Sequence, residues 1–216
     1  MTESLIEDVK TRHRRIANIA SVVSFAEPEV NRDTDGSAEI DFDWIELFKS
    51  YAERTSSKDV QVIWGKLLAG ELNHPGSYSK LAMWSLFNMS EKNAHDFAAL
   101  ASMCVHHCDK NGVAYGEPLL ILDSDSQPDS DAFNGGAISI RDVNMLASLG
   151  LVDTSSMRTL SFDPGQRQLF RGAEFMVEVT NGSDMQIDLV LLPIITCAGL
   201  ELLELSSIGT FQSLLE

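Results

Sequence analysis

The sequence lacks the features of a membrane or secreted protein. No run of apolar residues approaches the roughly 18–20 that a helix needs to cross a bilayer, and the longest, Leu189 to Ile195, contains Pro193. The first residues hold no continuous apolar stretch of the kind that a signal peptide requires. Only three residues are cysteine, an odd number that predicts free thiols in a reducing compartment. These absences favour a cytoplasmic protein with no membrane partner.

Basic residues are scarce. The chain has 16 lysine and arginine residues against 32 aspartate and glutamate residues, which gives a formal net charge of -16 at pH 7. Such a surface repels phosphate backbones and anionic lipids. Nucleic acid is therefore not an expected partner, and the charge favours proteins with basic surfaces. With 44% hydrophobic residues, the 216-residue chain can still bury the core of one or two globular domains.

The one dense basic patch of the sequence, KTRHRR at residues 10–15, lies within a predicted amphipathic helix over residues 1–26. Apolar residues recur on one side of this helix at helical spacing: Leu5, Val9, Ile16, Ile19 and Val23. A basic amphipathic helix is typical of membrane-surface or nucleic-acid binding. Because the rest of the chain is acidic, we favour packing of this stripe on the protein itself or on a second subunit. A polar linker is expected over residues 27–40.

Residues 41–111 are predicted to form a compact core of four helices with short connections. Capping side chains precede the apolar segments: Asp41 or Asp43, Ser56 or Ser57, Ser77 or Ser79, and Ser90. The fourth helix is expected to extend into the sequence CVHHC at residues 104–108. Each tryptophan falls on an apolar helical face, so all three are expected in the core: Trp44, Trp64 and Trp84.

A sharp corner between two helices is predicted within the sequence WGKLLAGELNHPGSYS, residues 64–79. Pro75 and Gly76 end one helix, and the serines that follow begin the next. Gly65 and Gly70 each cost about 1 kcal/mol in a helix relative to alanine. Close approach of a neighbouring helix at each glycine would explain them, and relaxed selection is the alternative.

The second half of the chain is predicted to mix strands and helices. Residues 112–138 contain extended pieces and an acidic loop, and residues 139–216 are expected to form a winged-helix-like unit. The whole chain is thus predicted to be mainly α. An N-terminal amphipathic helix and a four-helix core precede a small α+β unit with one antiparallel hairpin. The likeness of residues 139–216 to a winged helix rests on the order of elements and is no evidence of DNA binding.

The winged-helix-like unit is expected to begin with a helix capped by Ser139 and to end with a helix capped by Thr196. Two runs of alternating apolar residues lie between them, on either side of residues 181–183. A three-residue loop between these runs places Val177 opposite Ile187 and keeps one face of the hairpin apolar.

Five segments carry a resemblance to a known family: DFDWIELFKSYAE, VIWGKLLAGELNHPGSYS, LFNMSEKNAHDF, LASLGLV and ITCAGLELLEL. Together with RRIANIASVV near the start, they resemble an uncharacterised bacterial family classed as a domain of unknown function. Its hallmark is an acidic-Trp helix, then W-[GA]-K-[IL]-L-A-G-E-x3-P-G-[ST]-[FY]-S, and T-x-A-G-x-E-L near the C-terminus. The matching structural positions in this chain are Trp44, Trp64, Gly65, Gly70, Pro75, Gly76 and Gly199. The resemblance implies a helical core with a winged-helix-like tail and brings no activity, and the acidic loop at 123–136 departs from its pattern.

Cys104, His107 and Cys108 lie at i, i+3 and i+4, a spacing that puts three metal-ligating side chains on one face of a helix. A structural zinc site takes four ligands, and the sequence holds no second Cys/His pair. We therefore favour a helix end with two buried cysteines, and expect neither metal nor cofactor. The acidic run DSDSQPDSD lacks the glycine and glutamate positions of a calcium loop.

No sequence motif for nucleophilic catalysis, phosphate binding or dinucleotide binding occurs. Glu71, Asn73 and His74 cluster before Pro75 and could line a cleft, but such residues are also typical of a helix end. We predict a non-enzymatic protein that acts through protein–protein contact and self-associates through its N-terminal helix. Two alternatives stay open: a nucleic-acid-linked regulator that uses the winged-helix-like unit, and an enzyme or defence effector with an unrecognised site. No small-molecule ligand is identified.

Overall fold

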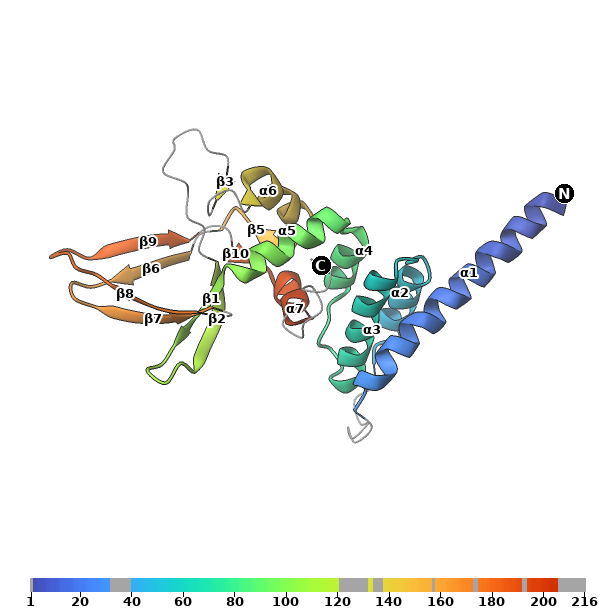
Figure 1. The fold of residues 1–216 in the computed structure, drawn as a ribbon, viewed down its shortest axis with the longest axis horizontal. Coiled ribbons are helices and arrows are strands. Elements are labelled where there is room, and N and C mark those ends of the chain that lie inside the picture. Colours follow the sequence, from blue (N-terminus) through green and yellow to red (C-terminus); the bar gives the residue numbers. More distant parts are fainter. Residues whose placement is uncertain are drawn as a thin grey trace. The chain divides into compact units, whose positions relative to one another are not determined.

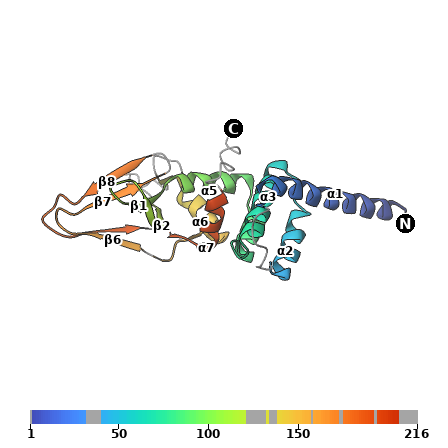
Figure 2. The same ribbon diagram turned by 90° about the horizontal axis from the view of Figure 1, so that it is seen from below.

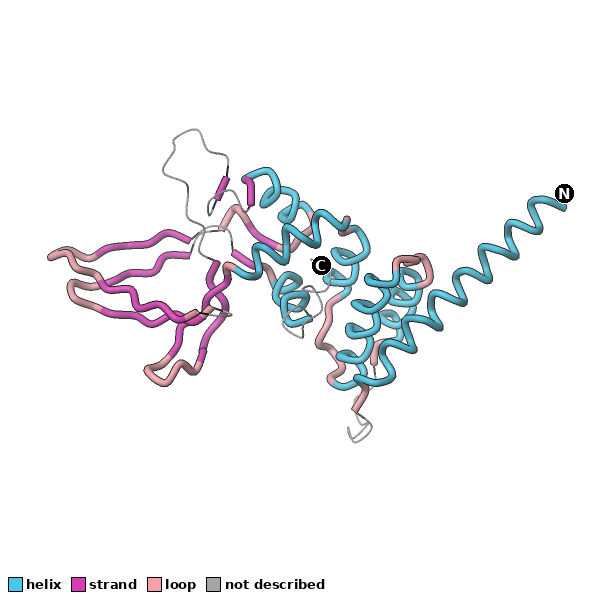
Figure 3. The backbone as a smooth tube through the Cα atoms, viewed as in Figure 1, coloured by secondary structure: helices cyan, strands magenta, loops and turns pink. Residues whose placement is uncertain are grey.

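The protein is described by a computed structural model over residues 2–31, 40–120, 132–133, 138–156, 158–172, 175–191 and 194–205. Over these residues it is mainly helical, with a smaller antiparallel β portion, as the sequence predicts (Figure 1; Figure 3). The predicted acidic loop at 123–136 lies almost wholly outside the described residues.

The chain divides into two compact units. Unit 1 consists of Met1–Asn88 with Glu201–Glu216, and unit 2 consists of Met89–Leu200. This division differs from the expected helical core over 41–111, because the fourth helix of that core belongs to unit 2. Each unit has its own buried side chains.

Unit 1 is helical in its described part, with α1 packed on α2 and α3. Aromatic side chains fill its core: the Trp44 and Phe48 rings stack with centroids 5.4 Å apart, and Phe48 meets Trp64 edge-on at 5.5 Å. Trp84 is 40% exposed, so the expectation of a core position is wrong for this tryptophan. The elements are α1 (Thr2–Ala26), the short 3-10 helix η1 (Glu27–Glu29), α2 (Phe42–Ala52), α3 (Lys58–Asn73) and α4 (Lys80–Asn88).

The first helix of unit 2 is α5 (Glu91–Ser102), and the described strands of the unit form four small sheets. The largest sheet has the order β2-β1-β7-β8, and the others pair β6 with β9, β5 with β10, and β3 with β4. The strands are β1 (Cys104–Cys108), β2 (Ala114–Leu120), β3 (Ala132–Phe133), β4 (Ile138–Ser139), β5 (Val152–Asp153), β6 (Arg158–Phe162), β7 (Arg167–Arg171), β8 (Met176–Thr180), β9 (Ile187–Leu191) and β10 (Ile194–Ile195). The helices that follow β4 and β10 are α6 (Ile140–Ser148) and α7 (Cys197–Leu205), and the last residues of α7 belong to unit 1.

Residues 104–108 form strand β1, so the expected helix through this sequence is wrong. The α5 helix ends at Ser102, and β1 then pairs with β2 on one side and β7 on the other. The turn from β1 to β2 is closed by Asp109, whose carboxylate accepts the backbone N–H of Asn111 and of Val113 at 2.9 Å. Pairing with two strands outweighs the local helical pattern, because it satisfies the backbone on both edges.

The predicted hairpin register is also wrong, because the two runs belong to different sheets. Val177 lies opposite Phe170 of β7, and Ile187 lies opposite Phe162 of β6. Phe162 and Phe170 pack with Val105 and Leu119 in one buried cluster, which joins the β6–β9 ribbon to the four-stranded sheet. Each apolar run therefore finds its partner in a strand that sequence reasoning overlooked.

The predicted caps of the last two helices are confirmed. Ser139 and Asp142 form a reciprocal capping box at the start of α6. The Thr196 hydroxyl accepts the backbone N–H of Gly199 at 3.1 Å at the start of α7. It also donates to the carbonyl oxygen of Gly150 at 2.5 Å, which ties the end of the α6 segment to α7.

Candidate interaction surface

The C-terminal half of α1 is anchored by close packing on α3. Val22 and Ala26 are buried, with 0% and 2% of their surface exposed. A Cβ atom at Gly65 of α3 would lie 2.6 Å from the Cβ of Phe25, so glycine at this position permits the two helices to approach. Of the two explanations that the sequence left open for Gly65, close approach of a neighbouring helix is the one that the structure supports. At Gly70, the close neighbour is instead the ring of Tyr78.

Polar contacts fix the same half of α1 to the corner between α2 and α3. The buried Asn18 amide donates to the Glu53 carbonyl oxygen at 2.9 Å and accepts from the Gln61 amide at 3.1 Å. Lys58 donates to the Ser21 hydroxyl at 2.7 Å, and an ion pair joins Arg15 to Glu53 at 3.4 Å. The buried contacts begin at Asn18, so they hold α1 from that residue onward, and Arg15 adds one exposed ion pair just before it.

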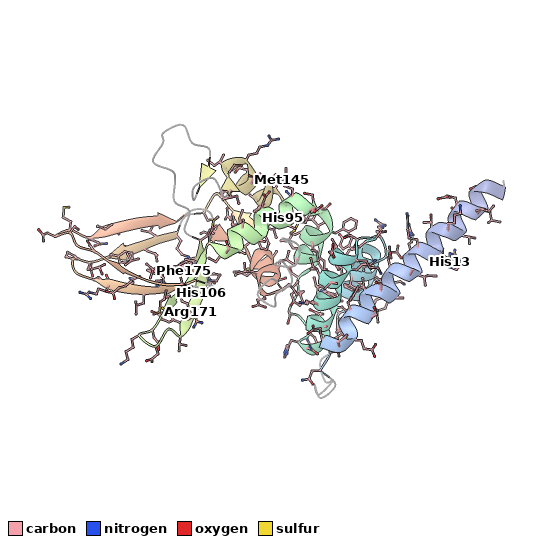
Figure 4. All side chains as sticks on the ribbon, viewed as in Figure 1. His13, His95, His106, Met145, Arg171 and Phe175 are labelled. Atoms are coloured by element: carbon pink, nitrogen blue, oxygen red, sulfur yellow. The ribbon has the colours of Figure 1, made fainter. Side chains whose placement is uncertain are left out.

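The N-terminal half of α1 extends beyond α2 and α3 within unit 1 (Figure 1; Figure 2). All its described side chains from Ser4 to Ala17 are exposed except Thr11, which is half-buried. Figure 4 labels His13 on this segment. Residues 4–17 are called the free half of α1 below.

Four of the five predicted interaction residues are exposed. Leu5 is 65% exposed, Val9 51%, Ile16 62% and Val23 48%, whereas Ile19 is half-buried. At about 100° per residue, this stripe lies roughly 120° around the helix from the buried Asn18 and Val22. The stripe is therefore a face of α1 distinct from the one that packs on the rest of unit 1. Sequence reasoning left out Ile6, which is 53% exposed on the free half.

Charge is segregated along the free half. Glu7 and Asp8 lie near its start, and Lys10, Arg12, Arg14 and Arg15 follow with no acidic residue among them. One short helix thus carries an acidic segment, a basic segment and an apolar stripe that runs through both.

The corner after α3 uses its polar residues to hold the backbone. The Glu71 side chain is 2% exposed, and its two carboxylate oxygens accept the backbone N–H of Gly76 at 2.7 Å and of Tyr78 at 3.0 Å. Trp44 donates its ring N–H to the Tyr78 carbonyl oxygen at 2.6 Å. Gly76 has a φ of 90°, a left-handed conformation that favours glycine.

The two other polar residues of the corner, Asn73 and His74, have surroundings different from those of Glu71. The Asn73 side chain bonds to the backbone of Glu29 and Asn31, and His74 is exposed. These contacts tie η1 and the chain after it to the end of α3. Glu71 and Asn73 thus both form hydrogen bonds that hold the backbone around the corner.

The C-terminal motif meets the same corner. Glu201 of α7 accepts the backbone N–H of Ser79 at 2.6 Å, where α4 is about to begin. Burial raises the pKa of the Tyr78 hydroxyl, and the carboxylates of Glu204, Glu71 and Glu201 raise it further. Elsewhere in that motif, a Cβ atom at Gly199 would collide with the Leu151 carbonyl oxygen. The corner after α3 and the C-terminal motif therefore both stabilise the fold through close contacts with the backbone.

The candidate metal residues lie on a strand and do not share one helical face. Cys104 and Cys108 are buried, and burial raises the pKa of Cys104 to about 12, which disfavours the thiolate that metals bind. The His107 ring lies 4.9 Å from Phe170 and 5.8 Å from Tyr115, and burial lowers its pKa, with Arg158 adding to the shift. Among the described residues, no group of three or more His, Cys, Asp or Glu side chains is placed to hold a metal ion.

Unit 2 exposes apolar side chains of its own near the β7–β8 turn and along β8 and β9. Phe175 is 50% exposed, Met176 56%, Met185 75% and Ile187 40% (Figure 4). Arg171, labelled beside Phe175, donates to the Gly112 carbonyl oxygen at 2.8 Å. This surface was missed because Phe175, Met185 and Ile187 were expected on the apolar face of one hairpin, whereas β8 pairs with β7 and β9 pairs with β6.

Comparison with known proteins places the chain in a family. A family model described as "Protein of unknown function (DUF2806)" matches residues 7–210, so the chain belongs to this family. Neither the curated proteins nor the solved structures contain a match to the chain. Across the described part of the chain, helices are too short or too polar to cross a membrane.

Proposed function

We propose that the protein works by protein–protein contact, that it self-associates, and that the free half of α1 is the surface it uses. The observation that supports this most strongly is the line formed by Leu5, Val9 and Ile16. Each is more than half exposed, on a helix segment that the described residues of unit 1 leave uncovered. Burying such side chains contributes about 1.5–3 kcal/mol each.

The stability of the free half supports the same proposal. Isolated helices shorter than about 12–15 residues are marginal in water, and most helices in proteins gain their stability from tertiary packing. Residues 4–17 have little such packing within unit 1. A partner that covers the stripe would supply it, and binding would then stabilise the helix that does the binding.

A reducing intracellular compartment fits this function. Cys104, Cys108 and Cys197 are all free thiols, and Cys197 is exposed. Because exposed thiols oxidise in secretory compartments, we place the protein in the cytoplasm. The acidic surface that its charge of -16 creates keeps the rest of the molecule soluble.

Sedimentation velocity over a micromolar concentration range tests the proposal. We expect the wild type to show a rising sedimentation coefficient, and Ile16→Asp to stay monomeric at every concentration. Ile140→Asp in α6 is the matched control, because Ile140 is 48% exposed and lies in unit 2. It should behave as the wild type does.

Two outcomes would contradict the proposal. A wild type that is monomeric at every concentration would rule out self-association. Equal association of wild type and Ile16→Asp would show that the interface does not lie on the free half of α1. The experiment is repeated after nuclease treatment, and association that disappears with nuclease would instead support the nucleic-acid-linked alternative.

A further inference from the structure

We infer that the free half of α1 pairs with the same segment of a second copy in antiparallel orientation, with Leu5 of each copy against Ile16 of the other. The inference rests on the proposed function and specifies its geometry. Three observations carry it: the spacing of the stripe, the order of charges along it, and the face of α1 on which it lies.

The stripe has the spacing of a two-helix seam. Leu5, Val9, Arg12, Ile16 and Ile19 are separated by four, three, four and three residues, which is the heptad spacing of core positions in a coiled coil. An antiparallel pair centred between residues 10 and 11 places Leu5 opposite Ile16 and Val9 opposite Arg12. Three of these four side chains are apolar, and the aliphatic stem of Arg12 can cover Val9 while its head stays in water.

The order of charges selects the antiparallel orientation. In that orientation, Asp8 of one copy lies beside Arg12 and Arg15 of the other, and the same contacts repeat across the two-fold axis. In a parallel pair, the core residue Arg12 would face Arg12 of the other copy, and the two basic segments would lie side by side. Like charges across a helix seam disfavour a pairing, and opposite charges favour it.

The position of the stripe leaves room for a second helix. It lies roughly 120° around α1 from Asn18 and Val22, the residues through which α1 contacts α2 and α3. A helix laid along the stripe therefore does not compete with the packing that anchors α1. The overlap of about 14 residues is short, so the pair should be weak and concentration-dependent.

Cysteine crosslinking of the full chain tests the orientation. In a Cys197→Ser background, Leu5→Cys and Ile16→Cys are prepared separately, one of them with a tag that changes its mass. Cys104 and Cys108 are buried and stay in place. Leu5 and Ile16 lie about 16 Å apart along one helix, at 1.5 Å per residue, and the crosslinker used is short enough to span only facing positions.

The antiparallel pair predicts crosslinks only in the mixture, and only between a Leu5→Cys chain and an Ile16→Cys chain. Crosslinking of Leu5→Cys alone would show a parallel pair and overturn the inference, while the proposed self-association would stand. Chains that sediment as dimers but crosslink in no combination would overturn the register. Chains that sediment as monomers would contradict the proposed function itself.

Charge reversal gives a second, independent measurement. We expect Asp8→Arg to weaken self-association about tenfold, because each substitution acts at two symmetric places and turns attraction into repulsion. Arg12→Asp should weaken it similarly, and an equimolar mixture of the two variants should associate at least as well as the wild type. An Asp8→Arg chain that associates as tightly as the wild type would overturn the antiparallel arrangement.

Discussion

Replacing Glu71 with glutamine is expected to loosen the corner between α3 and α4. The buried carboxylate accepts two backbone N–H groups, one from Gly76 at 2.7 Å and one from Tyr78 at 3.0 Å. A glutamine side chain has one acceptor oxygen and one donor NH2 group. One backbone N–H would therefore face a donor, and a buried donor without a partner costs about 1–3 kcal/mol. Since the lost bond is to a charged group, we expect a loss of about 2–3 kcal/mol in the free energy of unfolding.

Urea unfolding followed by tryptophan fluorescence measures this change. All three tryptophans lie in unit 1, so the signal reports the unit that contains the corner. In a thermal scan, the same loss corresponds to a fall of about 5–10 °C in Tm. Glu46→Gln is the matched control, because Glu46 is exposed on α2 and its replacement should change stability by less than about 0.5 kcal/mol. If Glu71→Gln unfolds at the same urea concentration as Glu46→Gln, the Glu71 carboxylate does not hold the corner.

Three further predictions concern unit 2. Gly199→Ala should destabilise it by about 1–3 kcal/mol, because the new Cβ forces the backbone apart, and far-UV circular dichroism during urea unfolding would show this as an earlier transition. The pKa of Asp142 is lowered to about 2 by hydrogen bonds from Lys92 and Ser139; unit 2 should therefore lose stability as pH falls from about 4 towards 2, and Asp142→Asn should flatten that slope. In the native protein, we expect only Cys197 to react rapidly with a thiol reagent, and the two buried cysteines of β1 to react once the protein is unfolded. Rapid reaction of all three cysteines in the native protein would contradict the burial of Cys104 and Cys108.

Local signals allowed the helix ends to be predicted from the sequence. Asp41, Ser90, Ser139 and Thr196 each accept a backbone N–H at a helix start. These contacts lie within three residues of the cap, so the sequence near each helix is sufficient to specify them. The sequence only suggested the packing at Gly65, because a costly residue inside a helix can reflect either close packing or relaxed selection.

The strands were mispredicted because strand pairing is not visible in local periodicity, and some of the partners are distant in the sequence. Residues 104–108 pair with β7, some sixty positions further along the chain, and local periodicity cannot report such a pairing. The hairpin was mispredicted for a different reason: Val177 and Ile187 each pair with a strand, β7 or β6, that the sequence reasoning did not include. The turn DPGQ between β6 and β7 was the available signal for both strands, since Pro-Gly marks a turn.

The candidate surface was only partly predictable. Periodicity identified an apolar stripe, but it cannot separate residues that face the protein from residues that face a partner. The structure makes this separation, because Asn18 and Val22 are buried while Leu5 and Ile16 are exposed. The half-buried position of Ile19 follows from the same geometry, since it lies at the edge between the two faces.

The most direct test of the central proposal is hydrogen–deuterium exchange of the full chain at several concentrations. A free helix segment with little tertiary packing should exchange quickly when the protein is dilute. If the segment is an interaction surface, protection of residues 4–17 should rise with concentration while α2 and α3 stay unchanged. Fast exchange of residues 4–17 at every concentration would contradict the proposal that this helix binds a second copy.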